Sequence, residues 1–135
     1  MADNFQHCEL GECISTFEES INCTVATGKT IVKGQVVEFA AEVVDGLPTI
    51  QPAAAGSLVV AGVARNSGAA GATVNVLTKG ITKVTAGTGG TTVGKKIMVG
   101  GEEGVVMDAD AYDKAIGRAY HTLAKDDIGL ILVNV

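Results

Sequence analysis

The sequence predicts an all-β protein, a small antiparallel β-barrel or sandwich with a flexible N-terminal arm. From residue 21 onward, short β-branched runs alternate with turn signals, and none shows a sustained helical stripe. Eighteen glycines and only two prolines fit a chain with many tight turns. Aromatic residues make up only 4 %, so valine, isoleucine, leucine and alanine must build the core. We therefore expect one β-rich domain, residues 21–135, preceded by an arm, residues 1–20.

The arm differs in composition from the rest of the chain. Residues 1–20 contain five carboxylates and neither lysine nor arginine. The first ten residues show no period that would bury one face, whereas "CISTFEE" (13–19) alternates and could add a strand. We expect the arm to be mobile in isolation. Its scattered apolar residues are Phe5, Leu10, Ile14 and Phe17.

The first strand is predicted at residues 21–25, "INCTV". Gly28-Lys29-Thr30 follows and matches the last three letters of a phosphate-binding loop. Cys23 stands where that loop requires its first glycine, and the β-branched sequence after Thr30 does not favour the helix start that would hold phosphates. We therefore interpret Gly28-Lys29-Thr30 as a turn and exclude nucleotide binding there.

Two strands are predicted at residues 35–44 and 47–51, because Asp45-Gly46 between them is a strong two-residue hairpin signal. "QPAAAGS" (51–57) has room for a short helical turn that connects to the next strand, residues 57–65. Since these runs follow one another closely, we expect consecutive strands to pair as antiparallel hairpins.

The second half contains six further runs of strand length. Residues 72–78 and 81–86 are expected to meet at a turn at Lys79-Gly80, and residues 95–99 and 104–109 at Gly100-Gly101. "DADAYDKA" (108–115) could form a second short helical turn. The last two predicted strands are residues 115–123 and 128–135.

An internal similarity links residues 61–77 and 116–135. Each segment reads as an apolar residue, Gly-x-Ala, a polar loop, glycine and an alternating strand. Gly62 and Gly117 would let two backbones approach closely or let the strand bend. We predict two related hairpins around one core. Its expected members include Val74, Val76, Val84, Ile97, Val99, Leu130 and Val133.

Charge and hydropathy exclude several classes of partner. The net charge is −5, the pI is near 4.9, and the largest basic cluster is Lys95-Lys96, so we expect no nucleic-acid partner. No apolar run approaches the roughly 18 to 20 residues that a membrane helix needs. The first residues lack the basic and apolar regions of a signal peptide, so we expect cytosolic synthesis and three free thiols.

Candidate chemical sites are weak. His7, Cys8, Cys13 and Cys23 could in principle ligate zinc, but the cysteine spacing lacks the two close pairs of a structural site. "DADAYD" (108–113) begins like a calcium loop and then lacks its glycine and its final glutamate. Asp113-Lys114-Ala115 is similar to a lipoyl-carrying hairpin, although it stands far from mid-domain. We therefore expect no metal ion and no cofactor.

Catalytic residues are also missing from the pattern. The chain has no G-x-S-x-G motif, and its serines lie in arm or turn contexts. His121 has Asp126 and Asp127 nearby in sequence, but an exposed loop histidine is much commoner than a general base. We predict that the protein is not an enzyme.

Four segments together resemble the small capsid decoration, or cement, proteins of tailed bacteriophages. They are "VKGQVVEF", "VVAGVARNSGAAGATVNVLTKGITKV", "TAGTGGTTVGKKIMV" and "AIGRAYHTLAKDDIGLILVNV", and the similarity runs over roughly residues 24–135. The resemblance lies in the order of these features, and it implies a β-rich domain on the outer face of the capsid, often a homotrimer. It further implies clamping of major capsid protein subunits and an N-terminal arm that orders on docking.

Under this reading, the expected capsid contacts are Phe5, Leu10, Ile14 and Phe17, and the protein is synthesised in the bacterial host and located on the virion. This chain departs from the resemblance in its cysteine- and glutamate-containing arm. The alternative hypothesis is a free-standing β-barrel binding or carrier module, either lipoyl-like or metal-binding.

Overall fold

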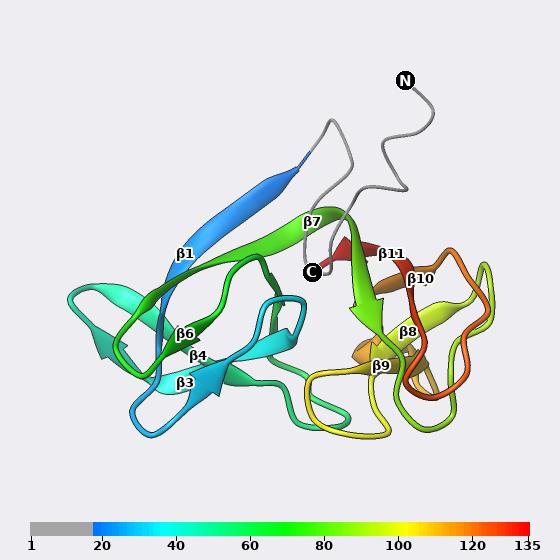
Figure 1. The fold of residues 1–135 in the computed structure, drawn as a ribbon, viewed down its shortest axis with the longest axis horizontal. Helices are drawn as coiled ribbons and strands as arrows, with labels where there is room; N and C mark the ends of the chain where they lie inside the picture. The colour runs from blue at the N-terminus through cyan, green and yellow to red at the C-terminus, as the bar shows by residue number, and fades with distance from the viewer. Residues whose placement is uncertain (1–17) are drawn as a thin grey trace.

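The structure, a computed structural model, describes residues 18–135 and confirms the all-β prediction (Figure 1). The strands are β1 (Glu19–Val25), β2 (Thr30–Ile31), β3 (Val36–Val44), β4 (Leu47–Pro52), β5 (Val60–Ala64), β6 (Gly68–Ala69), β7 (Thr73–Thr85), β8 (Lys96–Val99), β9 (Val106–Asp108), β10 (Gly117–Ala119) and β11 (Ile128–Asn134). A short 3-10 helix, η2 (Tyr112–Lys114), lies inside the predicted 108–115 segment. Within the described residues, no helix has the length and apolar character needed to cross a membrane.

Five strands form a barrel in the order β1-β4-β3-β5-β7, closed by the pairing of β1 with β7. The predicted barrel was antiparallel, and this is wrong at one seam: β1 runs parallel to β4, with Thr24 opposite Thr49. The other barrel pairings are antiparallel. The exception follows from the strand number, because directions cannot alternate around a closed ring of five strands. The barrel is therefore mixed.

Strand β7 joins the barrel to the second half of the molecule, which has the order β7-β11-β10-β8-β9. The turn predicted at Lys79-Gly80 is wrong, because β7 continues through both residues. Gly80 has a φ of 147°, a value that side-chain-bearing residues rarely adopt, and it lies where β7 changes its partner from β1 to β11. In Figure 1, β7 crosses the upper part of the molecule and then bends down toward β8 and β9.

Other predicted turns are confirmed. Asp45 and Gly46 connect β3 to β4, and both have positive φ, as a tight type I′ hairpin turn requires. Gly100 and Gly101 lie in the connection between β8 and β9. Residues 51–57 contain no helix, since Pro52 ends β4 and a simple turn follows at residues 55 and 56.

The two Gly-x-Ala glycines lie where the sequence predicted a close backbone approach. A Cβ added at Gly62 would overlap the carbonyl oxygen of Leu77 on β7. A Cβ added at Gly117 would likewise overlap the carbonyl oxygen of Leu132 on β11. The repeated motif therefore marks two strand contacts that exclude every side chain.

The buried residues form two clusters instead of the one core predicted. Val36 and Val37 of β3 belong to different clusters, because successive strand residues point to opposite faces. All seven predicted core residues are buried. The barrel cluster contains Cys23, Val25, Ile31, Val37, Ile50, Ala61, Ala64, Val74 and Val76. The second cluster contains Val36, Ala53, Val63, Val84, Ile97, Val99, Val106, Ile116, Ala119, Ile131 and Val133.

Candidate functional site

The predicted contact residues Phe5, Leu10, Ile14 and Phe17 lie outside the described residues. The structure does describe where the chain that carries them enters the barrel. We call this place the arm root. It consists of residues 18–22 together with Arg65, Asn75 and Thr78.

The arm root lies along β7. Glu19 is opposite Lys79 and Asn22 is opposite Asn75, with an irregularity in register between Glu19 and Ser20. Pairing with β4 is described only from Thr24 onward. The first half of β1 is therefore held in place by β7, through strand pairing and side chains of β7, and by Arg65, which follows β5.

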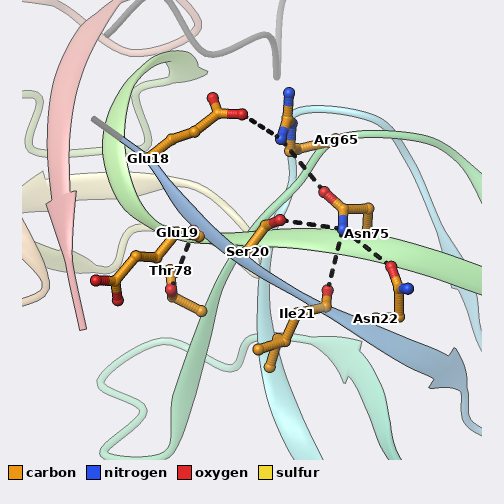
Figure 2. Close-up of polar contacts among 8 residues, drawn as sticks. All are labelled: Glu18, Glu19, Ser20, Ile21, Asn22, Arg65, Asn75 and Thr78. Carbon is orange, nitrogen blue, oxygen red and sulfur yellow. Dashed lines mark hydrogen bonds and ion pairs between the residues drawn. The ribbon is translucent and has the colours of Figure 1, made fainter. Parts of the chain in front are cut away.

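Asn75 is the centre of this polar network (Figure 2). Its side-chain amide donates to the Asn22 Oδ1 at 2.9 Å, to the Ser20 Oγ at 3.3 Å and to the Ile21 carbonyl at 3.5 Å. The Asn75 backbone N–H donates to the Asn66 Oδ1 at 2.9 Å, which ties the same residue to the β5–β7 connection. One side chain therefore contacts three consecutive residues of β1.

Two further contacts complete the arm root. The Arg65 Nη1 donates to the Glu18 Oε1 at 3.1 Å and to the Asn75 Oδ1 at 3.4 Å. The Thr78 Oγ1 donates to the Glu19 carbonyl at 3.1 Å. The side chains of Arg65 and Glu18 are 30 % and 37 % exposed, so their ion pair is screened by water and contributes little stability by itself.

The residues of the arm root come from segments that are far apart in the sequence. The alternation of "ATVNVLT" places Asn75 on the polar side of its strand, but nothing in the sequence links it to residues 18–22, because more than 50 residues separate them. The same holds for Arg65 and Glu18, which lie 47 residues apart. Sequence reasoning could not have identified this set.

A second exposed feature lies on the barrel. Phe39 of β3 donates its backbone N–H to the Val59 carbonyl at 3.1 Å, so these residues are neighbours. Phe39, Val59 and Leu58 are 40 %, 54 % and 64 % exposed, and Val43, further along β3, is 68 % exposed. We call these four residues the apolar strip. Clusters of exposed apolar side chains are typical of protein contact surfaces.

Of the four candidate zinc ligands, the described residues include only Cys23. His7, Cys8 and Cys13 lie outside the described residues, and Cys23 is fully buried in the barrel cluster. Burial raises the pKa of the Cys23 thiol, which disfavours the thiolate that binds metals. Within residues 18–135, no group of three histidine, cysteine or carboxylate side chains could hold a metal ion.

The acidic segment 108–113 is used structurally. Asp108 accepts hydrogen bonds from the backbone N–H and the hydroxyl of Thr92, at 2.8 and 2.6 Å. Asp110 forms an ion pair with Lys114 at 3.6 Å. Lys114 belongs to the 3-10 helix η2, whereas a carrier lysine stands at a hairpin tip.

The remaining candidates also have structural roles. His121 accepts the backbone N–H of Leu130 at its Nδ1, at 3.0 Å, and Asp127 accepts the backbone N–H of Ala124 at 3.1 Å. Asp126 occupies a turn with a φ of 70°. Gly28 likewise lies in a turn, with a φ of 75°, and Thr30 begins strand β2, which confirms the interpretation of Gly28-Lys29-Thr30.

Comparison with known proteins identifies a protein family and a similar fold. A family model described as phage cement protein matches residues 14–135, a range that includes Ile14 and Phe17 and excludes Phe5 and Leu10. The fold is similar to the N base of head fibre gp8.5 in bacteriophage phi29, with a TM-score of 0.66 and 16 % sequence identity over 87 % of this chain and 95 % of that one. At this identity, the likeness shows a shared fold. No curated protein matches the chain.

Proposed function

Because this chain belongs to the phage cement protein family, whose members are structural proteins of the virion capsid and not enzymes, we propose that it decorates the outer surface of a tailed-phage head. Its direct partner in this proposal is the major capsid protein, and its assembly state is a homotrimer. The protein would be made in the cytoplasm of the bacterial host and would then stabilise the capsid lattice by binding across neighbouring subunits.

The observation that carries this proposal is the arm root. Phe5, Leu10, Ile14 and Phe17 precede a segment that Asn75 and Arg65 hold on the barrel. An arm bound to the capsid would therefore transmit load directly to a rigid domain. Burying each large apolar side chain contributes roughly 1.5 to 3 kcal/mol before ordering costs, so four such residues are enough for useful binding.

Two other features support a place on the outside of the head. The net charge of −5 disfavours the DNA-filled interior, because phosphates and an acidic protein repel one another. The apolar strip offers a second contact surface, on the barrel itself. In a trimer, three arms and three strips act together, so modest individual affinities combine into strong attachment.

Deleting residues 2–12 tests the proposal. We expect the shortened protein to stay folded, with its β-sheet circular dichroism intact, and to occupy fewer sites on expanded capsids in a sedimentation assay. The matched control replaces Asn4 and Gln6 by serine, which leaves every apolar residue of the arm in place and should leave occupancy unchanged. Equal occupancy after the deletion would remove the arm from the mechanism.

The homotrimer is tested separately by multi-angle light scattering and by the density on decorated capsids. Three copies per site are expected. A monomer in solution together with monomeric density on the shell would contradict the proposed assembly, without affecting the test of the arm.

A further inference from the structure

One sheet face in the second half of the molecule carries a row of cations on partly exposed positions. Pairing in register aligns Ile81 of β7 with Leu132 of β11, Leu132 with Arg118 of β10, and Arg118 with Lys96 of β8. These side chains therefore lie in one row on one face of the sheet. The opposite face carries Val84, Ile131, Val133 and Ile97, which are buried in the second cluster.

Two more lysines extend this row. Lys79 and Lys83 lie two residues to either side of Ile81, so they point to the same face. We call the set Lys79, Ile81, Lys83, Lys96, Arg118 and Leu132 the basic face. On this side of the sheet, the part of β7 that follows Gly80 and the described strands β8, β10 and β11 contain no aspartate or glutamate. The basic face thus stands out in a chain of net charge −5.

Part of the basic face is hollowed. A shallow hollow of about 300 Å³ lies over its β8, β10 and β11 portion, lined by residues that include Lys96, Arg118, Leu132 and Tyr112. The Lys96 Nζ lies 3.5 Å from the centroid of the Tyr112 ring, and the Arg118 Nη1 donates to the Gly94 carbonyl at 2.9 Å. These contacts restrain both cations, which line the hollow, while Arg118 keeps donors for a carboxylate.

We propose that residues 1–17 of the same chain dock on the basic face in the free protein. This segment carries three carboxylates, no lysine or arginine, and four large apolar residues, so it complements a surface of cations and aliphatic side chains. The chain enters β1 beside this face, because Glu19 lies opposite Lys79. Seventeen extended residues reach about 55 Å, whereas four strands span only about 15 Å.

Docking within the chain goes beyond the proposed attachment to capsids. The same arm cannot occupy the basic face and a capsid subunit at once, so the two surfaces compete for it. Capsid binding is then weakened by the fraction of molecules whose arm is docked, and reversing charges on the basic face should release the arm.

Paramagnetic NMR of the full chain without capsids tests this directly. In the Cys13→Ser variant, a thiol-reactive nitroxide reagent labels Cys8 selectively, because Cys23 is buried. We expect the label to broaden the amide signals of Arg118 and Leu132 at least several-fold more than those of Asp45 and Gly46, which form the turn between β3 and β4 of the barrel. Raising the salt to about 1 M should reduce the broadening.

Matched variants separate charge pairing from chance proximity. Lys83→Glu with Arg118→Glu should abolish the broadening, and adding Glu9→Lys with Glu12→Lys should restore it. Lys29→Glu with Lys125→Glu reverses two charges away from the basic face and should change nothing. Absent broadening in the wild type, or broadening that survives the first pair, would overturn the proposal.

A mixed sample identifies which chain supplies the arm. Isotope-labelled protein without the nitroxide is combined with unlabelled protein that carries it. No broadening is expected in this mixture if each arm docks on its own chain. Equal broadening in the mixture would show a neighbouring copy's arm on the basic face and would refute docking within the chain. Because no capsid is present, either result leaves the proposed function to its own test.

Discussion

Replacing Gly117 by alanine should test whether the close strand contact in the second half is obligatory. The new Cβ would overlap the Leu132 carbonyl oxygen and would lie 2.9 Å from the Leu132 carbonyl carbon and 3.3 Å from the Val133 Cα. All three atoms are backbone, so no side-chain rotation relieves the clash. Strand β10 must therefore move away from β11.

The cost can be estimated from the contacts that hold β10. Overpacking typically costs 1 to 3 kcal/mol, and moving β10 weakens backbone hydrogen bonds such as Asn134 N–H to the Ile116 carbonyl, each worth roughly 1 kcal/mol. We expect a loss of about 3 kcal/mol in the free energy of unfolding. With a urea m-value of about 2 kcal/mol/M, the midpoint should fall by about 1.5 M.

Urea unfolding followed by far-UV circular dichroism measures this loss, since the chain has no tryptophan for intrinsic fluorescence. Gly94→Ala is the matched control: its φ is 83° and no atom lies within 4 Å of an added Cβ, so it reports backbone strain alone, at about 1 kcal/mol. If Gly117→Ala is no less stable than Gly94→Ala, then β10 and β11 move apart at little cost in the free energy of unfolding, and the close strand contact is not obligatory.

Three further outcomes are expected. Asn75→Ala should lower the free energy of unfolding by about 1 to 2 kcal/mol and speed amide hydrogen exchange in residues 19–22, because it removes the centre of the arm root. Unchanged exchange would show that the backbone hydrogen bonds between β1 and β7 are enough to fix this segment. Burial acts to raise the pKa of Glu38, but hydrogen bonds from Gln51, Ala54 and Ser57 outweigh it and hold the pKa below its ordinary value. The ionised Glu38 therefore stabilises the folded state at any pH above the pKa that Glu38 has in the unfolded state. In urea titrations, the free energy of unfolding of wild type should exceed that of Glu38→Gln by its full amount at neutral pH, and this difference should shrink as the pH falls through the lowered pKa. A difference that does not change with pH would refute this. In Cys8→Ser with Cys13→Ser, thiol reagents should label Cys23 only after unfolding, and rapid labelling of the native protein would contradict its burial.

Much of the fold was predictable because it depends on local patterns. β-branched alternation located most of the strands, and Asp45-Gly46 predicted its hairpin, since both signals arise from the residues' own conformational preferences. The Gly-x-Ala motifs predicted the two close strand contacts, because only a residue without a Cβ allows two backbones to approach so closely. The family resemblance was also available from the sequence, and the match over residues 14–135 confirms it.

The arm root and the basic face were not predictable. Asn75 and Lys83 look like ordinary polar positions on a strand, and their partners come from distant segments in a register that no local pattern encodes. The predicted capsid contacts Phe5, Leu10, Ile14 and Phe17 stay predictions, because they lie outside the described residues.

The sequence by itself determined the all-β class, most of the turns and the residues that must be buried, because period, glycine placement and side-chain volume act over a few residues. Only the tertiary structure decided how strands distant in sequence pair, that β1 runs parallel to β4, and that β7 passes through Gly80 to join two cores. Which strand edges pair depends on segments that are far apart in the sequence. Closing a ring of five strands requires one parallel pair, and no single segment of the sequence encodes which pair that is.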